Sequence, residues 1–227
     1  PAKVAGVPPD AFSDTGQKWG NPVYNWEKMT NDNYNWWVQR FKHIEKMVDK
    51  VRLDHFRGFE AYWEIPAESE NAVNGKWENA PGIEFFEKIN EKLKDLDIIA
   101  EDLGYITPGV EELKIRNNFP GMEIMQFMME PDLDEKLPFY YHQYQNFVYT
   151  GTHDNKTLWQ WYQDNLKKEN QTRKINNNLK TNDNNSDKNI SVEKLQKTES
   201  ISISTKSKEN ICWEFIEKVF ASPAVTA

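Results

Sequence analysis

VRLDH, at residues 51–55, is a short apolar run that ends in a carboxylate, and the pattern returns in IIAED at 98–102 and in VYTGTHD at 148–154. The carboxylates are those of Asp54, then Glu101 or its neighbour Asp102, and then Asp154. Acids just past the C-terminal ends of successive parallel strands converge on one pocket, and in barrel enzymes that pocket is the active site. We therefore expect three parallel strands that bring their acids together.

Helices are predicted around these strands, because apolar side chains recur there every three or four positions. Residues 37–48, 85–93 and 158–166 follow this spacing, which is typical of amphipathic helices. Thr107-Pro108 is typical of a helix start, with a hydroxyl N-cap followed by proline. The run 124–128 predicts a short buried strand. This alternation of strands and helices indicates an α/β fold with a parallel sheet.

The opening residues 6–22 are rich in turn-forming residues and hold no long periodic pattern. We interpret them as a structured loop. Trp19 lies within this polar stretch. A tryptophan in such a place favours a binding surface over core packing, and flat aromatic faces are what sugar rings stack against.

The segment 168–208 is dominated by asparagine, lysine, serine and threonine and contains no aromatic residue. It buries too little apolar area to offset its ordering entropy, so we expect a disordered insertion. Apolar periodicity resumes within 209–227, which predicts a helix that returns to the fold. Residues 1–167 are then the catalytic portion.

The composition of the chain bears on its binding partners and its cellular compartment. The 227 residues include 36 acidic and 28 basic ones, giving a net charge of −8, which argues against a nucleic-acid surface. Cys212 is the only cysteine and cannot form an internal disulfide, so we expect a cytoplasmic compartment. No run of about 18 apolar residues is present, so no membrane span is expected. The chain does not start with methionine, and we expect it to begin within a longer protein.

Converging carboxylates favour glycosyl chemistry. Breaking a glycosidic bond with retained configuration needs a carboxylate nucleophile about 5 Å from a protonated carboxylic acid. The acid needs a raised pKa, whereas a neighbouring arginine keeps the nucleophile ionised. Arg52 lies two positions before Asp54 and therefore on the same face of the strand.

The two histidines beside these acids leave other interpretations open. His55 and His153 adjoin Asp54 and Asp154, and histidine with aspartate can bind a divalent metal, as in a metal phosphohydrolase. Such an enzyme usually has more ligands than these four. Each histidine is also suited simply to hydrogen bonding at a strand end.

Taken together, the motifs resemble the amylomaltase family, the 4-alpha-glucanotransferases also called disproportionating enzymes. The similar segments are VAGVPPDAFSDTGQKWGNPVYNW, VRLDHFRGFEAYWEIPA, IIAEDLGYITPGV, PGMEIMQF and VYTGTHDNKT, with a weaker likeness at CWEFIEKVFASPA. The resemblance implies a (β/α)8 barrel of the alpha-amylase clan. The chain would then be a partial TIM barrel that lacks the N-terminal strands and carries the insertion at 168–208.

The resemblance also implies site residues and partners. Asp54 would be the nucleophile, Glu101 the general acid/base and Asp154 the stabiliser of the transition state. The residues that would contact the sugars are Arg52, His153, Asp102, Asp10, Gln17, Trp19 and Phe127. Donor and acceptor would be maltooligosaccharides or other α-glucans, and no metal or organic cofactor is implied.

Two positions depart from the family pattern. Ala11 stands where tyrosine is usual, and Lys156 stands where aspartate is usual. An amylase-like hydrolase and an inactive glucan-binding fragment stay as alternatives. Because a barrel that lacks strands has open sheet edges, we expect the isolated chain to be inactive. A plastid location would apply in a photosynthetic eukaryote.

Overall fold

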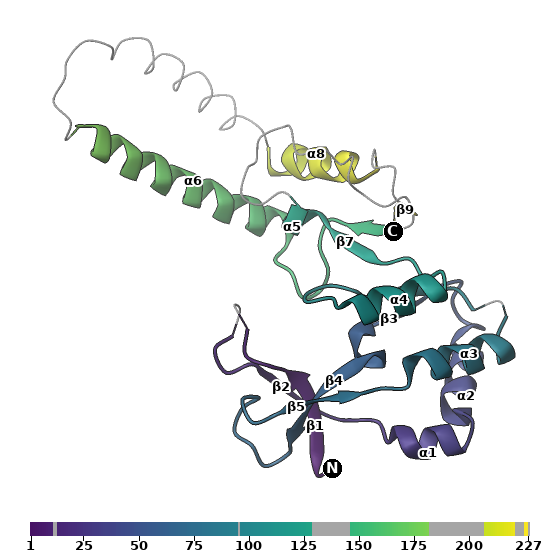
Figure 1. Cartoon of the computed structure of the whole chain (residues 1–227). Helices are drawn as coiled ribbons and strands as arrows, with labels where there is room; N and C mark the ends of the chain where they lie inside the picture. The colour runs from purple at the N-terminus through teal and green to yellow at the C-terminus, as the bar shows by residue number, and fades with distance from the viewer. Residues whose placement is uncertain (11–12, 95, 129–145, 182–206, 221–224, 227) are drawn as a thin grey trace. The chain divides into compact units, whose positions relative to one another are not determined.

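The computed structural model describes residues 1–10, 13–94, 96–128, 146–181, 207–220 and 225–226 (Figure 1). The chain divides into two units, Pro1–Met122 and Glu123–Ala227. Ala11, one of the two departures from the family pattern, lies outside the described residues.

The first unit alternates strands and helices in its central part. Its elements are β1 (Lys3–Val7), β2 (Gln17–Pro22), α1 (Trp26–Asn31), α2 (Asn35–Ile44), β3 (Val51–Leu53), the 3₁₀ helix η1 (Phe56–Phe59), β4 (Ala61–Pro66), β5 (Lys76–Asn79), α3 (Gly82–Lys92), β6 (Ile98–Ala100) and α4 (Pro108–Arg116). The order α2, β3, α3, β6, α4 agrees with the sequence prediction.

Strands β3 and β6 pair in parallel, as predicted. Val51 lies opposite Ile98 and Leu53 lies opposite Ala100. The pairing continues past the strands, because the Glu101 N–H donates to the Leu53 carbonyl at 3.0 Å. The residue after each strand is therefore an acid at the same end of the pair.

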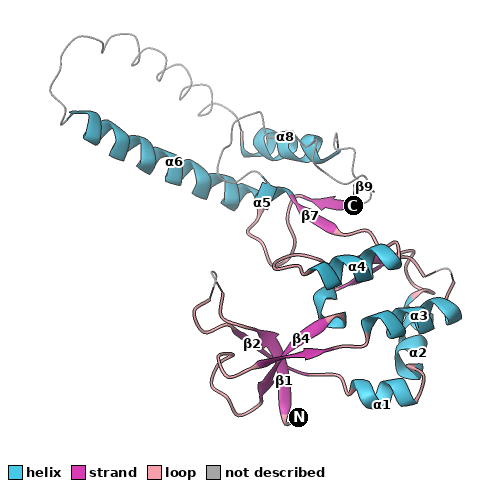
Figure 2. Ribbon diagram, viewed as in Figure 1, coloured by secondary structure: helices cyan, strands magenta, loops and turns pink. Residues whose placement is uncertain are grey.

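The opening of the chain differs from its prediction as a loop. Strands β2, β1, β4 and β5 form an antiparallel sheet in that order, drawn in magenta in Figure 2. β1 pairs with β2, and it also pairs with β4, so that Val4 lies opposite Ile65. Trp19 therefore lies on strand β2 and not in a loop. Pairing with the distant β4 stabilises a segment whose own residues favour turns.

An aromatic core joins the helices of the first unit to β3 and β6. Phe41 of α2, Phe85 and Phe86 of α3 and Phe56 of η1 are fully buried in one cluster with the apolar residues of the two strands. Burying a side chain of this size contributes about 1.5–3 kcal/mol. α4 begins as predicted, since the Thr107 hydroxyl accepts a hydrogen bond from the Val110 N–H at 3.3 Å. This core fixes the strand ends that carry the acids.

The second unit continues the alternation. Its elements are β7 (Met122–Ile124), which begins at the last residue of the first unit, α5 (Met125–Met128), β8 (Phe147–Tyr149), α6 (Leu158–Thr181), α8 (Lys208–Phe220) and β9 (Val225–Thr226). The strands form a sheet in the order β7-β8-β9, with β8 and β9 parallel. Trp161 of α6 packs against Phe215 of α8.

Two predictions need correction in the second unit. The run 124–128 is not one buried strand, because α5 starts at Met125 and its Phe127 is exposed. The predicted disordered segment 168–208 is helical over its first part, since α6 extends to Thr181, while residues 182–206 lie outside the described residues. The returning helix within 209–227 corresponds to α8.

In the described part of the chain, no helix is long and apolar enough to cross a membrane.

Candidate active site

Asp54 follows β3 and presents its carboxylate to solvent. The side chain is 71 % exposed, and its Oδ1 forms an ion pair with Nη1 of Arg52 at 2.8 Å. Arg52 points to the same side because it lies two residues earlier on the strand. Its Nε donates to Sδ of Met122 at 3.2 Å, which fixes the guanidinium. The predicted arginine and nucleophile are therefore in contact.

Glu101 follows β6 and is held in a different way. Its Oε2 accepts a hydrogen bond from the His55 N–H at 2.7 Å, and its Oε1 accepts one from the Leu103 N–H at 3.1 Å. Burial raises the pKa of Glu101, and the negative charge of Asp54 raises it further, against the lowering effect of the two N–H donors and of Arg52. A half-buried carboxyl with a raised pKa is suited to proton transfer.

His55 links the two acids, a role that the sequence did not reveal. It has a left-handed backbone, with φ 48° and ψ 54°, which is uncommon outside glycine and typical of functional turns. This turn directs its N–H to Glu101. Burial lowers the pKa of the imidazole, against the opposing effect of the Asp54 charge. Its ring packs edge-on against Trp19, with centroids 4.8 Å apart.

Asp102 is adjacent to Glu101 but lies in a closed environment. Its Oδ2 forms an ion pair with Lys114 Nζ at 2.5 Å, and both side chains are only 8 % exposed. Its Oδ1 accepts from the Met122 N–H at 2.7 Å. A Cβ at Gly121 would collide with this carboxylate. Asp102 therefore holds Lys114 of α4 and Met122, the first residue of β7, and its predicted sugar contact stays a prediction.

The predicted groove residues of the opening segment lie on or next to the antiparallel sheet. Trp19 is 43 % exposed, and its Nε1 donates to Oε1 of Gln17 at 3.1 Å. Asp10 lies in the turn that follows β1, where its Oδ1 accepts from the Ser13 N–H at 2.9 Å. Of these three residues, Trp19 lies beside the strand ends that carry the acids, through its contact with His55.

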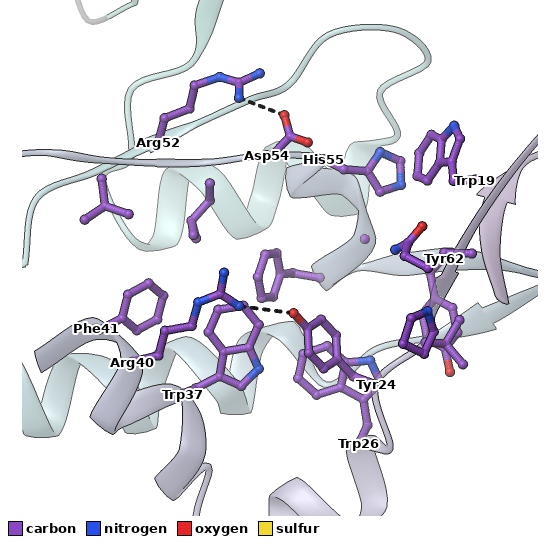
Figure 3. Close-up of a pocket in the computed structure, with 18 of the residues that line it drawn as sticks. Trp19, Tyr24, Trp26, Trp37, Arg40, Phe41, Arg52, Asp54, His55 and Tyr62 are labelled. Atoms are coloured by element: carbon purple, nitrogen blue, oxygen red, sulfur yellow. Dashed lines mark hydrogen bonds and ion pairs between the residues drawn. The ribbon is translucent and has the colours of Figure 1, made fainter. Parts of the chain in front are cut away.

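A cavity of about 540 Å³ opens next to Asp54 in the first unit. Figure 3 shows Arg52, Asp54, His55 and Trp19 toward one side and the aromatic residues of the α1–α2 region on the other. The labelled residues on that second side include Tyr24, Trp26, Trp37 and Arg40. Glu101 is not among the lining residues. The cavity follows the β3 strand, whose residues all line it.

The second unit carries the remaining predicted residues. Asp154 comes after β8, is 76 % exposed, and has its Oδ2 3.4 Å from Nε2 of His153. The turn is formed by Asn155, whose Oδ1 accepts from the Thr152 N–H at 2.7 Å. Lys156, the other departure from the family pattern, forms an ion pair with Asp164 at 2.8 Å. The three acids thus all follow strands, two in the first unit and one in the second.

The metal interpretation gains no support from the described residues. Among them, no group of three or more histidine, cysteine, aspartate or glutamate side chains is arranged to hold a metal ion. The ring of His55 instead packs against Trp19.

Comparisons with known proteins agree on one family. The sequence profile of the family described as "4-alpha-glucanotransferase" matches residues 2–227. A 4-alpha-glucanotransferase of Streptococcus pneumoniae is 51 % identical over 164 residues, which cover 72 % of this chain and 32 % of the relative. A chloroplastic/amyloplastic 4-alpha-glucanotransferase of Arabidopsis thaliana is 37 % identical over the whole chain and 35 % of its own length. The chain thus spans about a third of these relatives.

Comparison with solved structures also finds amylomaltases. Amylomaltase from Streptococcus agalactiae, solved in complex with acarbose, superposes with a TM-score of 0.66 at 44 % identity, over 72 % of this chain and 33 % of that one. Amylomaltase from Corynebacterium glutamicum has a TM-score of 0.60 at 20 % identity, over 68 % of this chain and 22 % of that one, and shows likeness of fold alone. The mixed α/β fold is therefore that of these structures.

Proposed function

Because this chain belongs to the 4-alpha-glucanotransferase family, we propose that the complete protein, the product of its whole reading frame, transfers α-1,4-glucan segments between maltooligosaccharides. The reaction is a double displacement with retained configuration. Asp54 attacks the anomeric carbon and holds the donor segment as a covalent glycosyl-enzyme. Glu101 protonates the departing oxygen and then takes the proton of the incoming 4-hydroxyl.

The observation that carries the proposal is the difference between the two strand-end acids. Asp54 is exposed and forms an ion pair with Arg52, so its carboxylate is open to the approach of an anomeric carbon. Glu101 is half-buried and has a raised pKa, which favours the protonated form that an acid catalyst needs. The parallel register sets Leu53 opposite Ala100, so both acids follow at the same end of the strand pair, which supports the short separation that double displacement requires.

The remaining roles are proposed from the family resemblance. We assign the stabilisation of the transition state to Asp154 and a sugar contact to His153, both of them exposed after β8. Asp10, Gln17, Trp19 and Phe127 would line the glucan groove, and the exposure of the Trp19 and Phe127 rings supports this. Asp102 would support a neighbouring sugar.

The barrel itself is also a proposal. β3 and β6 form a parallel pair flanked by helices, which is the repeating unit of a (β/α)8 barrel. Among the described strands, β3 pairs only with β6, and the cavity runs along β3. We infer that further barrel strands of the complete protein pack there, and that the 227-residue chain by itself has no measurable turnover.

Transfer rather than hydrolysis depends on the acceptor reaching the glycosyl-enzyme before water does. An acceptor sugar bound against aromatic surface gains effective concentration and displaces water. Incubation of the complete protein with maltotriose tests this point. Accumulation of longer oligosaccharides supports the transferase, whereas glucose and maltose alone would support the amylase-like alternative.

We further propose a cytoplasmic location, or a plastid one in a photosynthetic eukaryote. The lone Cys212 fits a reducing compartment.

A further inference from the structure

Arg57, Trp77 and Tyr105 form a stack of a cation and two rings in the first unit. Arg57 belongs to η1, Trp77 to β5, and Tyr105 to the loop after β6. The guanidinium carbon lies 4.1 Å from the centre of the Trp77 ring and 5.5 Å from that of the Tyr105 ring. Such contacts hold a guanidinium against aromatic faces. Three separate segments of the chain therefore meet at Arg57.

The loop that carries Tyr105 is fixed to the catalytic acid. The Leu103 N–H donates to Oε1 of Glu101 at 3.1 Å, and Gly104 then turns the chain with φ +91°. Nη1 of Arg57 donates to the Tyr105 carbonyl at 2.8 Å. This last bond uses the backbone of Tyr105, so it does not depend on the side chain. The loop is held at both ends within five residues of Glu101.

The Tyr105 side chain itself is largely exposed to solvent. It is 80 % exposed, the highest value among the exposed large hydrophobic residues of the described part of the chain. Leaving an aromatic ring in water forgoes the burial that usually stabilises it. A ring that is itself exposed, on a loop whose backbone is held by hydrogen bonds, is suited to stacking against a ligand.

We propose that Tyr105 is a stacking platform for the acceptor glucan. The inference rests on the proposed function and names one contact of that site. The general acid touches the oxygen that departs with the leaving sugar, and the acceptor later binds in the same place. Given the role proposed for Glu101, we assign the loop that runs on from it to the leaving-group side of the cleaved bond. Tyr105 at its end meets the acceptor chain and not the covalently held donor.

The test compares single variants of the complete protein. Tyr105→Ala removes the ring and leaves the bond from Arg57 to the backbone carbonyl. Tyr105→Phe and Tyr105→Trp keep a ring. Ile115→Ala is the matched control, because Ile115 of α4 is 74 % exposed in the same unit and has no place in the proposed site. Labelled glucose or maltose serves as acceptor at a fixed maltotetraose concentration.

We expect Tyr105→Ala to raise the acceptor KM about fivefold to tenfold, the value of one aromatic stack. Its kcat at saturating acceptor should match the unmodified protein, and its ratio of hydrolysis to transfer should rise. Tyr105→Phe, Tyr105→Trp and Ile115→Ala should leave the acceptor KM within twofold. Thermal unfolding of all variants should coincide.

The outcomes separate the two proposals. If the unmodified protein transfers glucan and Tyr105→Ala has the same acceptor KM, the platform is refuted and the transferase stands. A kcat loss with unchanged KM would also refute it, because it would indicate a structural effect on Glu101. If the unmodified protein does not transfer at all, both proposals fail together.

Discussion

At the end of β3 the carboxylate of Asp54 is 71 % exposed and bonded to a guanidinium, whereas at the end of β6 the carboxylate of Glu101 is half-buried and bonded to two backbone N–H groups. The register of the strands puts these residues side by side. Asp54 thus lies in solvent beside a cation, whereas burial raises the pKa of Glu101. The strand pairing brings the two acids to one end of the pair, and their surroundings differ.

Asp54→Asn in the complete protein gives the strongest test of this comparison. An amide cannot form the glycosyl-enzyme, so we expect transfer from maltotriose to fall about 10⁴-fold or more. Maltooligosaccharide binding should change little, which calorimetry measures. Asp49→Asn serves as control, because Asp49 is exposed and lies before β3. Turnover near the unmodified rate would remove Asp54 from the mechanism.

Glu101→Gln addresses the other member of the pair. Loss of the proton donor should lower kcat for maltotriose by about 10²–10⁴-fold. With α-maltosyl fluoride as donor, the leaving group needs no proton, so the glycosyl-enzyme should form at nearly the unmodified rate. Single-turnover kinetics with the two donors measure the difference. Equal losses for both donors would argue against acid catalysis by Glu101.

Lys114→Met tests how much the ion pair between Lys114 and Asp102, the acid next to Glu101, contributes to stability. It leaves the buried carboxylate of Asp102 without its cation, and breaking such a pair costs about 3–5 kcal/mol. Urea unfolding of the complete protein measures this loss. The double variant Lys114→Met with Asp102→Asn should recover part of it, because the uncompensated charge is then gone. A single variant as stable as the unmodified protein would show that the pair is solvated.

The smallest effect concerns the pKa of Glu101. Because the charge of Asp54 raises this pKa, Asp54→Asn should lower it, although burial keeps it above the ordinary value. Carbon-13 NMR of labelled glutamate follows the titration. In the unmodified protein the raised pKa moves the alkaline limb of kcat/KM to higher pH, since the acid must be protonated in the first step. An unchanged pKa in Asp54→Asn would show that the charge of Asp54 does not reach Glu101.

The sequence predicted those features that depend on local patterns. Apolar spacing located α2 and α3, the Thr107-Pro108 pair located the start of α4, and apolar runs located β3 and β6. The antiparallel sheet was missed because β2 is mostly exposed and forms through pairing with β1, which in turn pairs with the distant β4. Local composition there favoured turns, and long-range pairing outweighed it.

The backbone part of the site was beyond prediction for a different reason. The left-handed turn at His55 and the N–H groups of His55 and Leu103 leave no trace in residue identity. Lys114 was missed because a lysine on a helix usually faces solvent, and only the fold shows that it is buried against Asp102.

Gly121 packs directly against the carboxylate of Asp102. Any larger side chain there would displace the Asp102 carboxylate, and with it the ion pair to Lys114 and the loop beginning at Glu101. In a saturation-mutagenesis library of the complete protein screened for transfer from maltotriose, this position should return glycine almost alone, although it lies twenty residues after Glu101 in the sequence. Substitution tolerance at Gly121 would then report on the integrity of the loop that begins at Glu101 without substitution of the acids themselves.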